Sequence, residues 1–417
     1  MDDETLFPRF ALRAAETALC DTPVVVIQGA RQVGKSTLTQ MIAATRDARV
    51  VTMDDHLTLD LATDDPKAVI CQYPDGLLAI DEAQRAPELI LPLKAHVDAS
   101  RRPGRFLLTG SVDLLRVKGV GDSLAGRAET VEMLPFSQGE LARRETPEDF
   151  VTWLLHGAQG GDFSALDAEA VIRGGFPEAC KRSESRARSW MSSYVARLSD
   201  HDARELKGGG YADRLAAVLT YIASLGRAEL VKARLARHLG LAESTVDIYW
   251  RLAKSMHLVH ESRAWGRAPH RRLVLRPKVC LLDTGLSAAL VGFTSAQAAT
   301  PGGREYYGAL IKQFVVMELA KQRTWAEMPY DLHHFRALDG LEIDLLAEVG
   351  DGSLIAVEVK STQTPVAKHW KSLVALKDRL PDRDVTGVLL HTGDAVAHLH
   401  DWLHILPVTS LWQHGAC

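Results

Sequence analysis

One segment near the N-terminus combines residue types and spacing that suit phosphate binding. Residues 29–36 read Gly-Ala-Arg-Gln-Val-Gly-Lys-Ser, which fits the pattern G-x-x-x-x-G-K-[ST]. An apolar run at 24–27 predicts a buried strand directly before this loop, and a helix is predicted to begin at about Lys35. In such a loop, successive backbone N–H groups and the positive end of a helix point at phosphate oxygens.

This loop predicts that the chain binds and hydrolyses ATP, with Mg²⁺ as the metal. Lys35 is expected to reach the β- and γ-phosphates, and the Ser36 hydroxyl is expected to coordinate Mg²⁺. The predicted nucleotide contacts within the loop are Gly29, Gln32, Gly34, Lys35, Ser36 and Thr37.

Two further strand ends supply acids and hydroxyls. The apolar run at 77–80 ends in Asp81 and Glu82; we expect Asp81 to hold the Mg²⁺ shell and Glu82 to polarise the attacking water. Acids at strand ends are often only solvated charges, but their company with the phosphate loop favours the functional interpretation. The apolar run at 106–108 is followed by Thr109 and Ser111, and either hydroxyl could orient the water.

Arg127 is a candidate arginine finger, because a mobile arginine stabilises charge on a phosphoryl group in transfer. An ordinary surface arginine is the alternative that the sequence leaves open.

Near the C-terminus, acids and a lysine share strand faces. Alternation over 341–345 places Glu342 and Asp344 on one face, and alternation over 354–360 does the same for Glu358 and Lys360. This is the pattern of a PD-(D/E)XK nuclease, in which Asp344 and Glu358 would bind Mg²⁺ or Mn²⁺ and Lys360 would position or activate the water.

Glu318 interrupts the apolar stripe of a predicted helix. A carboxylate there is costly unless it is paired or bound to metal, so we expect Glu318 as a third metal ligand. Nuclease-like folds often lose cleavage and retain binding, so the sequence leaves open whether this site cleaves.

A basic segment lies between these two regions. Residues 227–278 hold twelve Lys or Arg and four Asp or Glu, a net charge of +8 in a chain whose net charge is −4. The segment predicts helices at 231–239 and 243–256 and strands at 258–261 and 272–275, which resembles a winged helix-turn-helix. Ser244 and Thr245 would then lie where such helices contact DNA. We expect DNA contact through Arg227–Lys278 and the C-terminal domain, with docking of a protein as the alternative.

Composition narrows the class of protein. No run approaches the ~18 consecutive apolar residues of a membrane helix. The N-terminus is acidic, which is the wrong sign for a signal peptide, and the five cysteines are scattered. We therefore expect a cytoplasmic protein with reduced thiols that does not bind membranes.

Several of these segments resemble prokaryotic AAA-type ATPases that carry a C-terminal domain of unknown function related to PD-(D/E)XK nucleases. The resemblance rests on residues 29–36, 80–84, 108–111, 124–127, 174–177, 283–286 and 358–360. It implies an AAA+-like parallel-sheet core, a helical lid, a winged-helix module and a nuclease-like α/β end. It also implies a homo-oligomer in which Arg127 acts on the ATP of a neighbour.

We accordingly predict an α/β protein with an AAA+-like P-loop ATPase core at 1–140 and a helical lid at 141–207. A winged helix-turn-helix at 211–283 and a PD-(D/E)XK nuclease-like domain at 300–417 follow. The predicted function is an ATP-hydrolysing protein that acts on DNA through a metal-dependent nuclease-like site. The alternative is a non-cleaving, ATP-driven switch that binds DNA or a protein. A metabolic kinase would need a second small-molecule motif, which we do not find.

Overall fold

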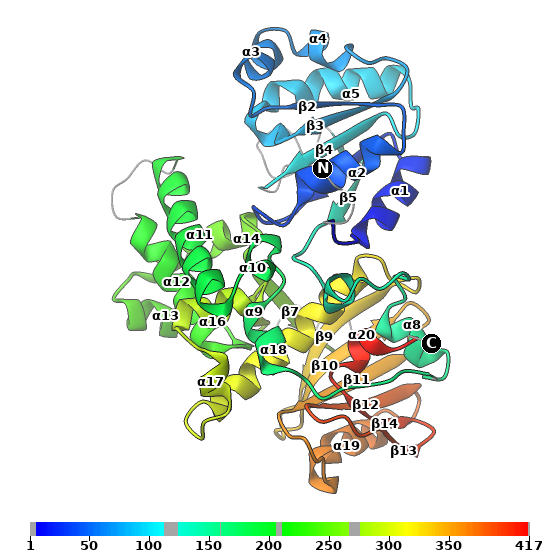
Figure 1. Ribbon diagram of the computed structural model, residues 1–417, viewed down its shortest axis with the longest axis vertical. Coiled ribbons are helices and arrows are strands. Elements are labelled where there is room, and N and C mark those ends of the chain that lie inside the picture. The colour runs from blue at the N-terminus through cyan, green and yellow to red at the C-terminus, as the bar shows by residue number, and fades with distance from the viewer. Residues whose placement is uncertain (1–5, 112–123, 159, 206–210, 267–275, 416–417) are drawn as a thin grey trace. The chain divides into compact units, whose positions relative to one another are not determined.

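The computed structural model describes residues 6–111, 124–158, 160–205, 211–266 and 276–415. The chain forms two compact units (Figure 1). The N-terminal unit comprises residues 1–135 together with 255–258. The C-terminal unit comprises residues 136–254 and 259–417.

Among its described residues, the N-terminal unit holds a parallel sheet of five strands in the order β2-β3-β4-β1-β5. The strands are β1 (Val24–Gln28), β2 (Ala48–Thr52), β3 (Leu77–Asp81), β4 (Phe106–Gly110) and β5 (Ala128–Glu132). Every residue of β1, β3 and β4 is buried, as the continuous apolar runs predict for a parallel sheet covered on both faces. The predicted parallel α/β core is confirmed.

Helices precede and connect these strands. They are α1 (Ala11–Asp21), α2 (Lys35–Ala44), α3 (His56–Asp64), α4 (Pro66–Ile70) and α5 (Ile90–Ala99), with short 3₁₀ turns at Ala83–Arg85 and Pro87–Leu89. β4 lies between β1 and β3, so the loops that follow these three strands open at the same edge of the sheet. That edge, at the carboxyl ends of parallel strands, is where open α/β sheets bind ligands.

The first part of the C-terminal unit is helical. Its helices are α7 (Gln138–Leu141), α8 (Phe150–Leu155), α9 (Ala168–Arg173), α10 (Pro177–Cys180), α11 (Glu184–Glu205), α12 (Tyr211–Leu225), α13 (Lys232–Leu239), α14 (Glu243–Ser255), α16 (Thr284–Val291) and α17 (Ser295–Ala298). α11, α12 and α16 pack against one another. The segments predicted as lid, winged helix and nuclease-like domain thus share one compact unit.

Two of the sequence motifs meet inside this unit. The Asp283 carboxylate accepts hydrogen bonds from Gly175 N at 2.7 Å and from Leu286 N at 3.0 Å. A Cβ on Gly174 would lie 2.1 Å from Asp283 Oδ1, so only glycine fits there. Residues 174–177 and 283–286 therefore form a packing contact that caps α16.

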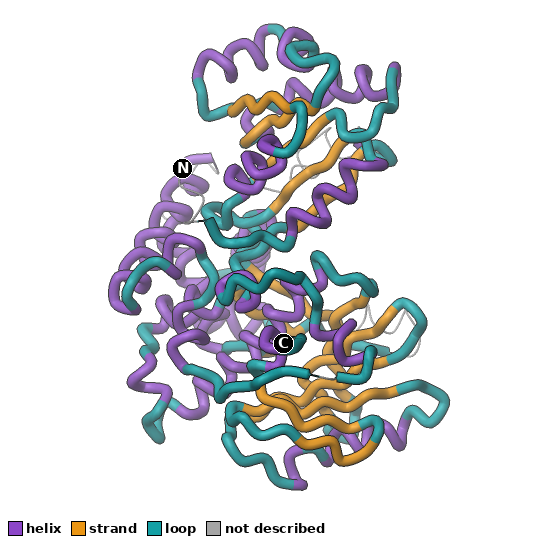
Figure 2. The backbone as a smooth tube through the Cα atoms, turned by 45° about the vertical axis from the view of Figure 1, so that its right-hand side comes forward, coloured by secondary structure: helices purple, strands orange, loops and turns teal. Residues whose placement is uncertain are grey.

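The C-terminal unit contains a mixed sheet, whose strands are drawn in orange in Figure 2. Its described strands follow the order β13-β14-β12-β11-β10-β9-β7-β8-β6. The strands are β6 (Ala228–Glu229), β7 (Val259–Ala264), β8 (Lys278–Leu281), β9 (Tyr330–Arg336), β10 (Glu342–Val349), β11 (Leu354–Lys360), β12 (Val385–His391), β13 (Ala397–His400) and β14 (Leu403–Pro407). β7 pairs in parallel with β9, so the strands of the basic segment continue the C-terminal sheet.

Three helices accompany this sheet: α18 (Arg304–Arg323), α19 (Lys371–Arg379) and α20 (Ser410–Gln413). Leu373 and Leu376 of α19 belong to a buried apolar cluster with β10, β11 and β12. α18 contacts β9 and β11, and this contact positions the candidate site of the C-terminal unit.

Candidate functional site

The loop at 29–37 has the backbone that its sequence requires. Gly34, at the N-cap of α2, has a φ of 99°, and Gln32 has a φ of 65° although it carries a side chain. A Cβ on Gly29 would lie 2.0 Å from the carbonyl oxygen of Met133, far inside contact distance. Such left-handed non-glycine conformations are costly and occur mainly at functional sites.

Lys35 lies within this loop. Its ammonium donates hydrogen bonds to the carbonyl oxygens of Gly29 at 3.0 Å and of Ala30 at 2.9 Å, and the side chain is buried. Burial lowers the pKa of Lys35 to about 8, although the charges of Glu82 and Asp81 oppose this effect. A phosphate in the loop would favour the charged form of this amine.

Hydrogen bonds join the ends of β3 and β4 to the loop. Ser36 Oγ donates to Asp81 Oδ2 at 2.8 Å, and the Thr109 hydroxyl donates to Asp81 Oδ1. Glu82 N donates to Thr109 Oγ1 at 3.0 Å. A serine hydroxyl beside an aspartate carboxylate offers the hard oxygen donors that Mg²⁺ prefers, so these residues fit the predicted metal.

Glu82 contacts Ser111, which the sequence singled out, and Gln84, to which the sequence gave no role. The Glu82 carboxylate accepts hydrogen bonds from Gln84 Nε2 and, at 3.4 Å, from Ser111 Oγ. Gln84 Nε2 also lies 3.2 Å from Ser111 Oγ. Gln84 stands two residues after Glu82, on the 3₁₀ turn that follows β3, and this proximity was the signal that could have identified it.

Arg127 is engaged within its own unit. Its guanidinium makes a two-bond ion pair with Asp98, with Nε–Oδ1 at 2.6 Å and Nη2–Oδ2 at 3.0 Å. Nη1 donates to the carbonyl oxygen of Ala125 at 3.0 Å. Hydrogen bonding to Arg127 lowers the pKa of Asp98. Action as an arginine finger would require Arg127 to leave Asp98.

The C-terminal site brings together Asp344, Glu358 and Lys360. Leu345 pairs with Val357 in the antiparallel β10–β11 ladder, and Asp344 and Glu358 are the neighbouring residues on these two strands. Asp344 Oδ2 accepts from Val359 N at 3.0 Å, and Lys360 pairs with Glu358 Oε1. Burial, together with the charge of Asp344, raises the pKa of Glu358 to about 6.

Glu318 does not join them, which corrects the expectation of a third metal ligand there. Its carboxylate is fully buried, pairs with Lys321 Nζ at 2.8 Å and accepts from Gln138 N at 2.8 Å. Instead, Lys312 of the same helix contacts Asp344, with Nζ 2.7 Å from Oδ1. Six helical positions separate Lys312 from Glu318, about 9 Å along the axis and on a different face.

The donor set of the C-terminal site therefore does not fit the predicted metal. In the described part of the chain, no three His, Cys, Asp or Glu side chains form a group that could hold a metal ion. Both carboxylate oxygens of Asp344 accept hydrogen bonds, one from Lys312 Nζ and one from Val359 N. Of the four carboxylate oxygens of Asp344 and Glu358, only Oε2 of Glu358 is buried without a hydrogen-bond partner.

The basic segment is less exposed than its net charge suggests. Lys232 pairs with Asp247, Lys254 pairs with Glu261, and the buried Lys278 pairs with Glu342. Arg227 is buried and donates to the Asp344 carbonyl oxygen at 2.7 Å. Among the described lysines and arginines of this segment, those exposed to solvent are Arg234, Arg237, Arg251, Arg263 and Arg276. Arg267, Arg271, Arg272 and the predicted strand at 272–275 lie outside the described residues.

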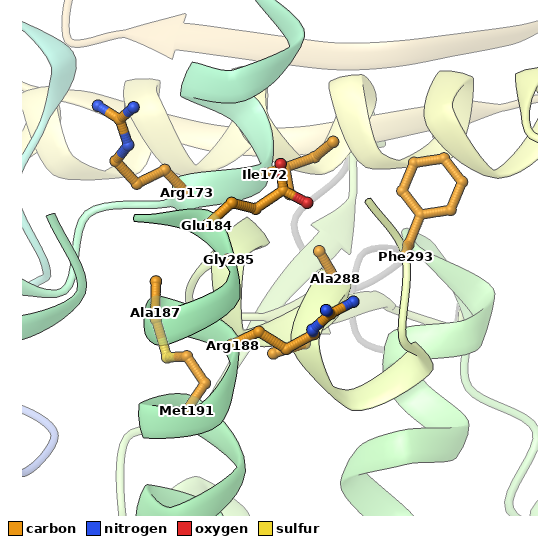
Figure 3. A pocket seen from close by; sticks show the side chains of 10 residues that line it. Ile172, Arg173, Glu184, Ala187, Arg188, Met191, Gly285, Ala288 and Phe293 are labelled. Atoms are coloured by element: carbon orange, nitrogen blue, oxygen red, sulfur yellow. The ribbon is translucent and has the colours of Figure 1, made fainter. Parts of the chain in front are cut away.

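A small pocket in the C-terminal unit is lined by side chains of α9, α11 and α16 and by Phe293 (Figure 3). Glu184, which lines it, is already bonded to Ser295 through Oγ at 2.5 Å and N at 3.3 Å. None of the predicted site residues lines this pocket.

Comparison with known families divides the chain into three stretches. Residues 21–142 match the model of an AAA domain. Residues 166–297 and 307–411 match two domains of unknown function, DUF8612 and DUF4143. None of the helices among the described residues is long and apolar enough to cross a membrane.

Similar proteins add the following. Uncharacterized proteins of Mycobacterium bovis and Mycobacterium tuberculosis are each 28% identical over 411 residues, which is 98% of this chain and 85% of theirs. A Walker-type ATPase of Pyrococcus abyssi has a TM-score of 0.43 and 16% identity, over 69% of this chain and 97% of its own. A DNA replication initiation factor has a TM-score of 0.25 and 13% identity, over 56% of this chain and 69% of its own. At such TM-scores the two structural likenesses carry no functional information. The AAA domain match and the loop geometry support a P-loop ATPase-like N-terminal domain, followed by a second domain built on a mixed sheet.

Proposed function

We propose that this chain binds and hydrolyses ATP with Mg²⁺ at the loop formed by residues 29–37. The observation that carries the proposal is the contact of Ser36 with Asp81, because it joins the end of the phosphate loop to the acid at the end of β3. Thr109 holds the other oxygen of that carboxylate, so three separate segments converge on one position.

Each residue then has a role that follows from its place. Lys35 binds the β- and γ-phosphates in exchange for the two carbonyl oxygens it now contacts. When bound with ATP, Mg²⁺ neutralises phosphate charge, and Ser36 and Asp81 would hold it. Glu82 orients the attacking water, while Gln84 and Ser111 fix the direction of its carboxylate.

Arg127 would act on the ATP of a neighbouring copy after it is released from Asp98. This role makes the active form a homo-oligomer. The Asp98 pair stabilises the idle position of the guanidinium, because a two-bond contact fixes its orientation.

For the C-terminal unit we propose the non-cleaving switch rather than the nuclease. Glu318 lies with Lys321 and Gln138, so the third carboxylate of the predicted metal site is missing. DNA would be bound through its phosphates by exposed arginines of α13 and α14, and ATP turnover would control its release.

The first experiment compares ATP hydrolysis by the wild type and by Lys35→Ala, measured as phosphate release. Loss of the ammonium removes the contact with the transferring phosphate, so hydrolysis should fall to background. Lys67→Ala, an exposed lysine of α4, is the matched control and should hydrolyse ATP like the wild type. Full activity in Lys35→Ala would refute the assignment of the phosphate site.

A further inference from the structure

Each of the two carboxylates of the C-terminal site forms an ion pair with a lysine ammonium group. Lys312 Nζ lies 2.7 Å from Asp344 Oδ1, and Lys360 Nζ contacts Glu358 Oε1. Both residues are buried, Asp344 with 4% of its surface exposed and Glu358 with 6%, so bulk water solvates neither charge well. The lysines supply the compensating charge that buried carboxylates require.

The position of Lys312 decides what else can bind. A divalent ion needs several oxygen donors close together, and it is repelled by an ammonium at the same oxygen. Asp344 Oδ2 is also taken, by Val359 N, which leaves Glu358 Oε2 as the one buried carboxylate oxygen of the pair without a partner. One free oxygen does not make a metal site.

Further positive charge lies behind Asp344. The buried guanidinium of Arg227 donates to the Asp344 carbonyl oxygen at 2.7 Å, and Lys278 also acts on this carboxylate. Burial alone favours the neutral acid, but Lys312 and the Val359 N–H hold the pKa of Asp344 below its usual value. The site is therefore an ion-paired cluster that is complete without a metal.

We propose that Lys312 occupies the place of a divalent cation, so that the C-terminal unit binds neither Mg²⁺ nor Mn²⁺ at Asp344 and Glu358 and does not cut nucleic acid. The proposal rests on the non-cleaving form of the proposed function and names its cause. Lys312 is the side chain of α18 that contacts Asp344, so a change at this one position tests the proposal directly.

Mn²⁺ titration by calorimetry tests this on the full-length, nucleotide-free protein. The wild type should show no Mn²⁺ site that Asp344→Asn removes. Lys312→Glu replaces the ammonium with a carboxylate and should gain a site at least about 10-fold tighter than any wild-type binding. The double variant Lys312→Glu/Asp344→Asn should lose that gain. Lys371→Glu, which alters an exposed lysine of α19, should gain nothing.

Three results would overturn the proposal. They are a wild-type Mn²⁺ site that disappears in Asp344→Asn, Mn²⁺-dependent cleavage of labelled DNA that disappears in the same variant, and no gain of binding in folded Lys312→Glu. If Lys312→Glu does not fold, as judged by circular dichroism, Lys312→Gln removes the ammonium with little change in volume and should show a smaller gain. ATP hydrolysis, measured on the same samples, separates failure of the N-terminal assignment from failure of this one.

Discussion

Glu358→Gln should make the C-terminal unit more stable at neutral pH. Burial, and then the charge of Asp344, raises the pKa of Glu358 from 4.5 to about 6 in the folded protein. Ionised Glu358 therefore opposes folding, because the folded state holds its proton more tightly than the unfolded chain does. Glutamine keeps the shape of the side chain and removes the charge.

The magnitude follows from the size of this shift. The difference between 4.5 and about 6 corresponds to about 2 kcal/mol of unfolding free energy. Stability of the wild type should fall as pH rises from about 4.5 to about 6 and stay lower above that window. Glu358→Gln should lack this fall, so its advantage should reach about 2 kcal/mol at pH 7.5 and shrink towards zero near pH 4.5.

Urea unfolding followed by tryptophan fluorescence measures this quantity for one unit alone. All eight tryptophans lie in the C-terminal unit, so the signal is independent of the N-terminal unit. Glu305→Gln, at an exposed position of α18, is the control and should leave stability unchanged at every pH. The reasoning would be refuted if Glu358→Gln were less stable than the wild type at pH 7.5. It would also be refuted if the difference in unfolding free energy between the two did not vary with pH.

Two further changes test the phosphate loop and the basic segment. Gly29→Ala places a methyl group 2.0 Å from the Met133 carbonyl oxygen, so the loop must move, and affinity for a fluorescent ATP analogue should fall by at least about 10-fold; Gly302→Ala, whose methyl group would meet nothing within 4 Å, should bind normally. Arg234→Gln/Arg237→Gln removes two exposed charges of α13, so binding of a labelled DNA duplex should weaken and its salt dependence should flatten by about two contacts, as measured by fluorescence anisotropy. Salt-independent binding that the double change leaves intact would instead favour docking of a protein.

The phosphate loop was predictable because its chemistry is local. Gly29, Gly34 and Lys35 follow one another along the chain, and a strand on one side with a helix on the other determines their geometry. The contacts of Asp81 were only partly predictable. Its place at the end of β3 follows from the apolar run before it, but its bond with Thr109 requires β4 to lie beside β3.

The net charge of the basic segment was a weaker guide. Counting residues treats every lysine and arginine as free, whereas Lys254 and Lys278 have acidic partners in the folded unit. Arg227 is buried beneath the C-terminal site, where no partner outside the protein can reach it. A lysine or arginine that is paired with an internal acid, or buried, adds little to the positive electrostatic potential at the protein surface.

The sequence by itself therefore predicted the P-loop that follows β1 and the two strands that carry Asp344 and Glu358, because residue types, spacing and strand periodicity are properties of short segments. It also marked Glu318 as a carboxylate that needed a partner. Lys321, three residues further along the same helix, is a partner that helical spacing alone could have suggested. Only the tertiary structure decided that the backbone N–H of Gln138 also bonds to Glu318 and that Lys312 is the side chain that contacts Asp344. The reason is physical: the face of α18 that meets β9 and β11 depends on packing across the unit, which periodicity within one helix does not specify.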